Sequence, residues 1–487
     1  MLMKFFRNKL TLVLFFFGII YSLISLVNHY CFRTYALDLG AYTNALYDYI
    51  HLQWNDSSVF KEVPENLLSD HFDLYLILFS PFIYLFKTYT LLIIQIISVL
   101  IGAYGVYLYF MKQISSSNAQ HIAILLTIAF LLFFGIYSAL SYDYHSNVVA
   151  SMLIPYFFLF IREKKRLLSF LILFFICIAK ESMPLIMSFV ILGLLLEYFK
   201  DALRRKYLFV FIVFCVSYFL IVTQFLMPYF SNDGKFYQFK YSILGSNFSS
   251  AIIHILQHPL DTLKYLFINH TNNPKADFVK AELHIFVLLS GLWLLFFKPN
   301  YLLMLLPVYF QKMYHDNYLT WGIDHQYSVE FAPIIIIGAG EFIINQRNYI
   351  TQRIISIILI LLNLSVTIRL MDRTILFTNK SRIRIYQSSH YQRNFDIKNV
   401  YSAISIIPND AIVSAQTSIL PHLALRDKIY CFPIIKDAEY IILNTKDDTY
   451  PLDTAGYKIK VNQLLQDTAQ WKILFDKQSV VVLGRKK

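Results

Sequence analysis

Acidic and histidine side chains recur in the short polar segments that separate long apolar stretches of this chain of 487 residues. Four such segments hold Asp38; Asp70, His71 and Asp73; Asp143 and His145; and Asp324 and His325. A carboxylate can take a proton as a general base, and an imidazole can change its charge near neutral pH or bind a phosphate as a cation. The pattern predicts one polar site for acid–base chemistry, assembled from segments far apart in the sequence.

Asp38 lies in the run Arg33–Gly40, directly after the first apolar stretch, so its carboxylate is expected close to a membrane surface. Asp70 and His71 stand at the other end of the same polar segment. We interpret Asp38, Asp70 and His71 as the candidate catalytic residues. The alternative for any one of them is a structural role, because Asp readily caps the N-terminus of a helix.

Lys180 and Glu181 interrupt an apolar stretch whose two ends are basic. Charges at membrane depth are costly and usually pair with one another or face a polar cavity. An ion pair is therefore one interpretation, and a lysine that binds a lipid phosphate as a point charge is the other. The candidate substrate-binding residues are Arg33, Asp143, His145, Lys180, Glu181, Asp324, His325, Gln326 and Tyr327.

The run Trp321–Tyr327 crowds donors and acceptors together just before an apolar stretch. Such a set suits a sugar or a pyrophosphate, whose oxygens need several fixed polar partners. Asp and His side chains also ligate metals, and a divalent cation such as Mg²⁺ or Mn²⁺ is an alternative that the spacing leaves open.

The elements that must position these residues are predicted to be membrane helices. Residues 1–372 contain about eleven apolar segments, the longest near the ~20 residues that cross a bilayer. We place the spans at 10–29, 89–111, 119–140, 146–161, 167–179, 183–199, 207–228, 282–297, 300–314, 328–345 and 354–372, with outer loops at 30–88 and 229–281. Residues 74–86 are apolar but short and contain Pro81, so we predict a re-entrant or interfacial helix there.

The charge distribution orients the predicted spans. The net charge is +12, and Lys and Arg cluster at 162–166 and 200–206, between apolar stretches. Cytoplasmic loops of membrane proteins carry an excess of Lys and Arg. We therefore predict an integral protein of the plasma (inner) membrane with a cytoplasmic N-terminus and the acidic loops outside. Because this clustering accounts for the charge, no nucleic-acid partner is expected.

The composition changes near Met371, which divides the chain into a membrane domain, 1–372, and a domain at 373–487. In the second domain, short β-branched and aromatic runs predict strands at 411–414, 428–432, 440–444, 471–475 and 480–483. Helices are predicted between them at 417–424 and 458–467. After about eleven crossings this small α/β domain is expected on the outer face.

An ordered set of motifs carries a resemblance to a known family. The motifs are Ala36-Leu-Asp38-Leu-Gly40 with Asn44-Ala-Leu46, Asp70-His71-Phe72, Tyr144-His145, Lys180-Glu181, Asp324-His325-Gln326-Tyr327, Ile407-Pro408-Asn-Asp410-Ala411 and Leu420-Pro421-His422-Leu423. Over nearly its whole length the chain resembles a domain-of-unknown-function family of predicted bacterial and archaeal membrane proteins. That family is in turn similar to the GT-C superfamily of integral-membrane glycosyltransferases.

The resemblance implies a GT-C-like, all-α polytopic fold and transfer of a sugar from a polyprenyl-phosphate donor on the outer face. GT-C enzymes use an acidic residue of the first outer loop and invert the anomeric centre, which makes Asp38 the expected acid/base residue. The family does not settle the roles of Asp70 and His71. Two features depart from the usual pattern: no second acid adjoins Asp38, and Asn44 stands where a glutamine is usual.

The expected function is therefore that of a membrane glycosyltransferase, with a polyprenyl-phosphate-linked sugar and membrane lipid as partners. The acceptor is a glycan, a lipid or a protein. A transporter or flippase of lipid-linked sugars is the alternative, although transporters typically show internal repeats and a midplane site, and the sequence shows neither. A structural partner in a cell-envelope assembly is the third interpretation.

Overall fold

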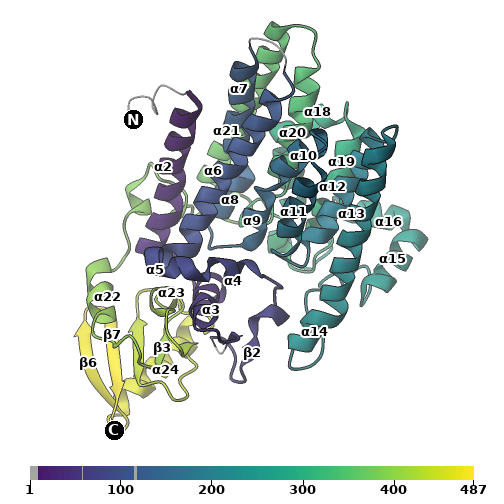
Figure 1. The fold of residues 1–487 in the computed structure, drawn as a ribbon. Helices are drawn as coiled ribbons and strands as arrows, with labels where there is room; N and C mark the ends of the chain where they lie inside the picture. Colours follow the sequence, from purple (N-terminus) through teal and green to yellow (C-terminus); the bar gives the residue numbers. More distant parts are fainter. Residues whose placement is uncertain (1–8, 58, 115–117, 487) are drawn as a thin grey trace.

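The computed structural model describes residues 9–57, 59–114 and 118–486. Figure 1 shows a large helical region whose helices run side by side and a small region with a β-sheet at the C-terminal end of the chain. One extensive cluster of buried apolar side chains fills the helical region, and two smaller clusters lie about the sheet. The protein is thus mostly helical, with a separate small mixed domain.

The helical region follows the apolar segments of the sequence. The helices in or near the predicted spans are α2 (Lys9–Tyr30), α6 (Thr90–Met111), α7 (Ala119–Leu131), α8 (Phe134–Leu140), α9 (Ser146–Ser151), α10 (Ile154–Arg162), α11 (Arg166–Cys177), α12 (Met183–Glu197), α13 (Ala202–Ile221), α17 (Val279–Val287), α18 (Trp293–Leu295), α19 (Pro299–Met313), α20 (Phe331–Ile344) and α21 (Tyr349–Asp372). The segments between them contain α3 (Ala41–Ile50), α4 (Tyr75–Phe79), α5 (Ile83–Phe86), α14 (Met227–Phe230), α15 (Phe248–Gln257) and α16 (Pro259–Tyr265).

Several helical stretches are long and apolar enough to cross a membrane. Within the described residues there are 5, namely Lys9–Tyr30, Tyr75–Met111, Ala202–Phe230, Pro274–Leu295 and Tyr349–Asp372. The number of candidate spans rises to 6 if α7 and α8, which meet at a bend of 47°, are counted as one span. Shorter apolar helices lie between them, and the larger span count expected from the sequence stays a prediction.

Residues 74–86 do not form one continuous helix. They divide into α4, a 3₁₀ turn at Ser80–Phe82 that contains Pro81, and α5. Lys87 then takes a positive φ of 50° before α6 begins. Figure 1 shows α4 and α5 near the end of the helical region that faces the small domain.

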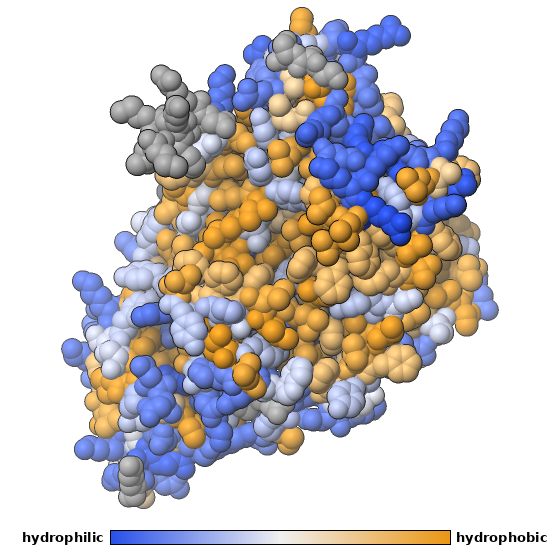
Figure 2. All heavy atoms as spheres, in the orientation of Figure 1, coloured by the Kyte–Doolittle hydropathy of each residue, from blue (hydrophilic) through white to orange (hydrophobic). Residues whose placement is uncertain are grey.

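The basic loops gather at the opposite end of the helical region. The Arg204 guanidinium donates to the carbonyl of Arg162 at 2.8 Å, and the Lys164 ammonium lies 3.3 Å from the Asp201 carboxylate. These contacts bring the two Lys/Arg clusters of the sequence together. Figure 2 shows a hydrophobic band with hydrophilic residues above and below it, the pattern expected of a membrane protein.

The small domain contains all five strands expected from the sequence. They are β3 (Val413–Ala415), β4 (Ile429–Cys431), β5 (Tyr440–Asn444), β6 (Trp471–Lys477) and β7 (Val480–Arg485), in the order β4-β3-β5-β7-β6. β3 pairs in parallel with β4 and β5, and β7 pairs antiparallel with β5 and β6. The helices are α22 (Ile397–Ile404), which the sequence did not predict, α23 (Leu420–Leu423) and α24 (Thr454–Gln466).

The small domain packs directly on the first polar loop. A short π-helix, Ala36–Gly40, lies against α23, so close that a Cβ atom on Gly40 would lie 2.5 Å from Leu420 Cδ2. The Asn44 amide donates to the carbonyls of Ala424 and Arg426 at 3.2 and 2.8 Å. Asn44 therefore joins the helical region to the small domain.

Residues 373–396, here called the strap, connect α21 with α22 and lie along the helical region. The Asn28 amide donates to the carbonyl of Arg382 at 2.7 Å, and a ring nitrogen of His390 donates to the carbonyl of Leu23 at 2.9 Å. The sequence boundary at 372 assigned this segment to the small domain. Its contacts with α2 show that it belongs equally to the helical region.

Asn44→Ala is expected to weaken the docking of the small domain. The change leaves the carbonyl of Arg426 without its donor, while the carbonyl of Ala424 still accepts from the Arg426 N–H at 2.9 Å. An unsatisfied buried polar group costs about 1–3 kcal/mol. Thermal unfolding of the full-length protein should show a lower midpoint, and hydrogen exchange should rise across α23. Asn394→Ala is the control, because that exposed amide donates only to the Lys446 carbonyl. Equal effects of the two variants would contradict the docking role.

Candidate functional site

The candidate site centres on Asp38, which stands in the π-helix Ala36–Gly40 just after α2. The Asp38 side chain is half-buried. Asp143 holds this loop from the turn between α8 and α9, because its carboxylate accepts hydrogen bonds from the backbone N–H groups of Tyr35, at 2.8 Å, and Leu39. The loop is thereby fixed on both sides of Asp38.

Asp143 is held in turn by Arg382 of the strap. The Arg382 guanidinium lies 3.2 Å from the Asp143 carboxylate and over the rings of Tyr142 and Tyr35, at 4.8 and 5.3 Å from their centroids. Such stacking adds cation–π attraction to the ion pair. The strap thus positions the first loop through Asp143.

Gln95 of α6 fixes the backbone of the same turn. Its amide donates to the carbonyl of Asp143 at 3.3 Å and accepts from the N–H of His145 at 2.9 Å. His145 is buried, and its ring stacks on Tyr142. Burial lowers the pKa of His145 well below its usual value, and the charges of Lys180 and His71 lower it further. His145 is therefore a neutral imidazole in the site.

The electrostatic environment of Asp38 makes it a proton acceptor near neutral pH. Burial, followed by the charge of Asp143, raises its pKa to about 7, while His71 and Lys180 act in the opposite direction. Burial raises the pKa of Asp143 to about 6, against the attraction of Arg382. A general base works best when its pKa is near the operating pH. Asp38 meets this condition.

His71 and Glu181 form a second pair beside Asp38. A ring nitrogen of His71 lies 3.1 Å from Glu181 Oε1, and Glu181 Oε2 accepts from the N–H of Phe72 at 3.2 Å. Burial raises the pKa of Glu181, but His71 outweighs it, and the pKa falls to about 2. The pKa of His71 is raised although burial and Lys180 lower it, because Glu181 and Asp70 favour the charged imidazole. Glu181 thus holds the loop that carries His71.

Lys180 is a buried cation without a paired carboxylate. Its side chain is 9% exposed. In the described part of the chain no carboxylate oxygen lies within ion-pair distance of its ammonium, so the pairing of Lys180 with Glu181 that the sequence left open is not seen. The charge of Lys180 acts on Asp38, His71 and His145. Lys180 is therefore free to bind an anion beside Asp38.

Asp70 contacts the polar loop between α14 and α15. It is exposed, and its carboxylate accepts from the amide of Gln238 at 2.7 Å. Asp70 also lies near enough to raise the pKa of Asp38 slightly. It therefore lies at the edge of the site.

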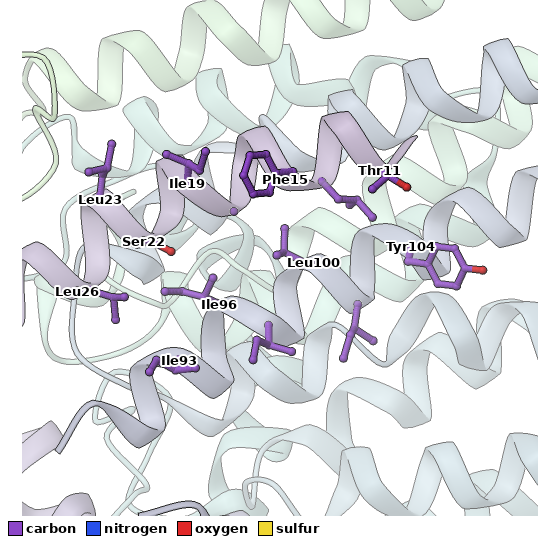
Figure 3. Close-up of a pocket in the computed structure, with 14 residues that line it drawn as sticks. Thr11, Phe15, Ile19, Ser22, Leu23, Leu26, Ile93, Ile96, Leu100 and Tyr104 are labelled. Carbon is purple, nitrogen blue, oxygen red and sulfur yellow. The ribbon is translucent and has the colours of Figure 1, made fainter. Parts of the chain in front are cut away.

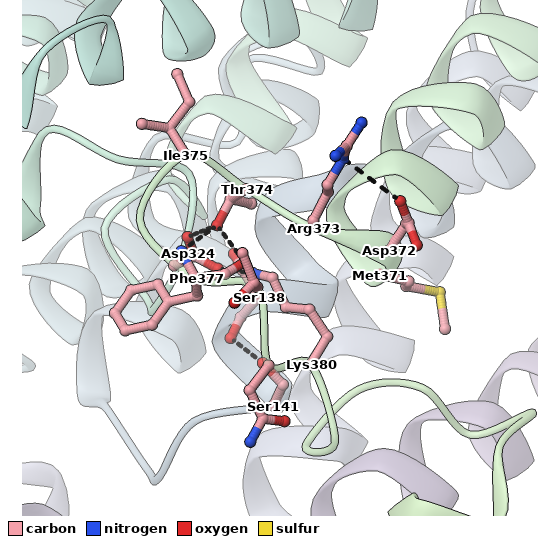
Figure 4. A network of polar contacts seen from close by, with 12 residues as sticks. Ser138, Ser141, Asp324, Met371, Asp372, Arg373, Thr374, Ile375, Phe377 and Lys380 are labelled. Atoms are coloured by element: carbon pink, nitrogen blue, oxygen red, sulfur yellow. Dashed lines mark hydrogen bonds and ion pairs between the residues drawn. The ribbon is translucent and has the colours of Figure 1, made fainter. Parts of the chain in front are cut away.

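The segment 322–327 forms a neighbouring polar cluster. The Asp324 carboxylate pairs with the Lys380 ammonium and accepts from the Thr374 hydroxyl at 2.7 Å, as Figure 4 shows. His325 has a φ of 62°, and its ring lies 4.4 Å from that of Tyr142. Backbone strain of this kind persists only where the surroundings impose it and is common at functional sites.

Gln326 and Tyr327 face the same region. The Gln326 side chain is buried and its carbonyl oxygen has no hydrogen-bond partner in the described residues. The Lys312 ammonium of α19 lies 5.8 Å from the centroid of the Tyr327 ring. The charge of Asp38 also acts on Tyr327, which links this cluster to the first loop.

Arg33 lies just after α2, where the charges of Arg393 and Arg382 of the strap act on it. Its guanidinium donates to three backbone carbonyls of the strap, those of Ser389, His390 and Gln392, at 2.5–2.8 Å. These bonds attach the strap to the end of α2. The contacts of Arg33 are structural.

Two residues of the site, Arg382 and Lys380, were not among the candidates drawn from the sequence, and both come from the strap. Asp73, which the sequence groups with Asp70 and His71, is a buried carboxylate that accepts from the N–H of Tyr75 at 2.9 Å at the start of α4. Burial raises the pKa of Asp73 to about 7. The sequence did contain a signal for the two strap cations. Lys380, Arg382 and Arg384 follow the last predicted span on the outer side of the membrane, where few Lys and Arg residues are expected.

The arrangement does not provide an obvious metal shell. Over residues 9–57, 59–114 and 118–486, no group of three or more His, Cys, Asp or Glu side chains is placed to hold a metal ion. The acids of the site contact Arg382, Lys380 and His71 instead.

The fold and the site are those of a polytopic helical membrane protein with a polar cluster at one end of its helices. The chain belongs to the DUF2079 family of predicted membrane proteins, whose model matches residues 28–482. No curated protein matches the chain in sequence. The family match covers the helical region from the end of α2 onward, together with the strap and the small domain.

Asp143→Asn is expected to lower the pKa of Asp38 below about 7. The substitution removes a negative charge that disfavours ionised Asp38. Infrared difference spectroscopy across a pH titration follows the protonated carboxyl group, and its loss in Asp38→Asn assigns the band. Asp448→Asn, which removes an exposed acid of the small domain, serves as the control. An unchanged or higher midpoint in Asp143→Asn would show that the two carboxylates do not interact.

Proposed function

We propose that this protein is a membrane glycosyltransferase that moves a sugar from a polyprenyl-phosphate donor to an acceptor hydroxyl on the outer face, with inversion. The observation that carries the proposal is the setting of Asp38. Its half-buried carboxylate has a pKa of about 7 and lies beside a buried, unpaired Lys180. A base and a phosphate-binding cation in one place are what this reaction requires.

In the proposed reaction Asp38 takes the proton of the acceptor hydroxyl as its oxygen attacks the anomeric carbon. The bond between that carbon and the phosphate oxygen breaks on the opposite side, and the polyprenyl phosphate leaves with the electron pair. Lys180 stabilises the charge that develops on the leaving phosphate. Because the leaving group is a phosphate, no general acid is needed. Asp143 and Arg382 position the loop that carries the base.

The proposed membrane arrangement has about eleven spans and a GT-C-like fold. The N-terminus is cytoplasmic, and the site and the small domain are extracytoplasmic. Two observations support this arrangement: the basic loops contact one another at one end of the helices, and the small domain packs at the other end. The small domain would then contribute to selection of the acceptor through its contacts with the first loop and the strap.

An apolar groove supports a lipid-linked donor. A cavity of about 850 Å³ lies between α2 and α6 and is lined by side chains such as Phe15, Ile19, Ile96 and Leu100 (Figure 3). Leu23, whose carbonyl binds His390 of the strap, lines it as well. A long isoprenoid chain in this groove would bury its apolar surface while its phosphate reached the polar end of the helices.

Asp38→Asn is expected to lower kcat by about 10²–10⁴-fold, the usual contribution of a general base. The measurement is transfer from a set of labelled polyprenyl-phospho-sugars by purified protein in lipid. The wild-type rate should rise with pH through a midpoint of about 7, because only the ionised carboxylate accepts a proton. Asp448→Asn is the matched control.

Two outcomes of this experiment would favour a flippase. One is an Asp38→Asn variant that keeps wild-type turnover. The other is a wild-type protein that translocates the lipid-linked sugar in vesicles without transferring it, together with unchanged cellular glycans in a deletion strain.

Leu100→Trp is expected to raise KM for long-chain donors several-fold and to leave kcat nearly unchanged. The larger side chain fills the groove, which removes chain binding but not the chemistry at Asp38. Donors with short chains that do not reach Leu100 should show a wild-type KM. Leu203→Trp, an exposed site on α13, is the control. An equal loss for short and long donors would contradict a role of the groove in chain binding.

A further inference from the structure

A small polar cavity is lined by Tyr142, and the reaction proposed above does not use it. Its volume is about 100 Å³, and the residues that matter here are Ser138, Ser141, His325, Asn379, Lys380 and Arg382. We call it the strap chamber because the strap supplies three of these residues. A water molecule occupies about 30 Å³ in the liquid. The chamber therefore has room for a small oxyanion but not for a sugar ring with its hydration shell.

The charges of the strap chamber suit an anion. Lys380 and Arg382 contribute two cations, and Asp324 is the only acid that lines the chamber among the described residues. Each cation is already held in place by a carboxylate, Lys380 by Asp324 and Arg382 by Asp143. The Arg382 Nε–H is buried and has no hydrogen-bond partner in the described residues. A guanidinium with a spare donor is well suited to an oxyanion.

Hydroxyl, amide and imidazole groups complete the chamber. Ser138 and Ser141 come from the end of α8, and Figure 4 shows both beside Lys380 and Asp324. The His325 ring lies between Tyr142 and Phe377, at 4.4 and 5.4 Å from their centroids. In the part of the chain that the structure describes, neither ring nitrogen of His325 has a hydrogen-bond partner. Asn379 is exposed, so the chamber borders the outside of the strap.

The chamber is distinct from the anion position at Lys180 but is coupled to it. Tyr142 lines the chamber, and the charges of both Asp38 and Arg382 act on its hydroxyl group. The strap leads directly into the small domain, which packs against the loop that carries Asp38. An anion in the chamber would therefore lie against Tyr142, which the charge of Asp38 also reaches, and on the segment that joins the two domains.

We propose that the strap chamber binds a phosphate group of the acceptor, so that the enzyme acts on acceptors that carry a phosphate. This inference rests on the proposed transferase function, because only a transferase has an acceptor. Phosphate binding to the chamber can be measured without turnover. The phosphate can belong to a lipid headgroup or to a soluble phosphate ester. Lys380 and Arg382 hold its charge, and Ser141, Asn379 and His325 bind its oxygens.

The test measures binding by isothermal titration calorimetry to the full-length protein in detergent micelles. One arm uses inorganic phosphate, and the other uses short-chain phosphatidic acid with the matching diacylglycerol as its uncharged control. We expect at least one phosphate ligand to bind and diacylglycerol to bind at least tenfold more weakly. Preference for phosphatidic acid assigns the chamber to a lipid headgroup, and equal affinity for inorganic phosphate assigns it to a soluble ester.

The decisive variant is the double substitution Lys380→Met and Asp324→Asn. It removes the cation without leaving an unpaired buried carboxylate, which is the costly defect in a buried pair. Loss of the charged hydrogen bond should weaken phosphate binding about tenfold or more. The matched control is Lys428→Met with Asp437→Asn, an exposed ion pair of the small domain. Asn379→Ala changes the exposed side of the chamber and is expected to weaken phosphate binding several-fold.

Wild-type phosphate affinity in the folded double variant would overturn the proposal that the strap chamber binds phosphate. Equal binding of phosphatidic acid and diacylglycerol, without binding of inorganic phosphate, would also overturn it. Loss of binding in Lys180→Gln alone would also overturn it, because the phosphate would then lie beside Asp38. The transfer assay separates this inference from the proposed function. If the wild type binds phosphate but transfers no sugar, the chamber stands and the transferase proposal fails.

Discussion

The buried ion pair between Asp143 and Arg382 is the interaction on which the site depends. The Asp143 carboxylate accepts hydrogen bonds from the backbone N–H groups of Tyr35 and Leu39. Arg382 belongs to the strap, more than two hundred residues further along the chain. A buried carboxylate without a partner would take up a proton or unfold its surroundings. The pair therefore lets the first loop, the turn after α8 and the strap occupy one place.

This pair also explains why the small domain cannot be considered separately from the helices. The strap attaches to α2 through Arg33, Asn28 and His390, and the domain that follows it contacts the π-helix Ala36–Gly40 through α23. A displacement of the small domain would move the strap, and with it Arg382. The geometry around Asp38 is thus shared between two regions of the chain.

The balance of charges in the site favours a proton acceptor over a permanent anion. Burial and Asp143 raise the pKa of Asp38, while Lys180 and His71 keep it from rising further. Glu181 differs, because the neighbouring His71 lowers its pKa to about 2 although burial raises it. The surroundings thus give two nearby acids different protonation behaviour. One carboxylate remains ionised and structural, and the other can exchange a proton near neutral pH.

The sequence alone determined the apolar helices, the five strands of the small domain and the short list of acids and histidines, because hydropathy, β-branched runs and residue chemistry are local properties. Which charges meet depends on how the chain folds in three dimensions. Arg33 was expected in the site and binds the strap, Asn44 joins the domains, and Arg382 and Lys380 enter the site from a segment without periodicity. Such pairings join residues 56 to 382 positions apart, and in a low-dielectric interior their energies depend on distances that no local pattern encodes.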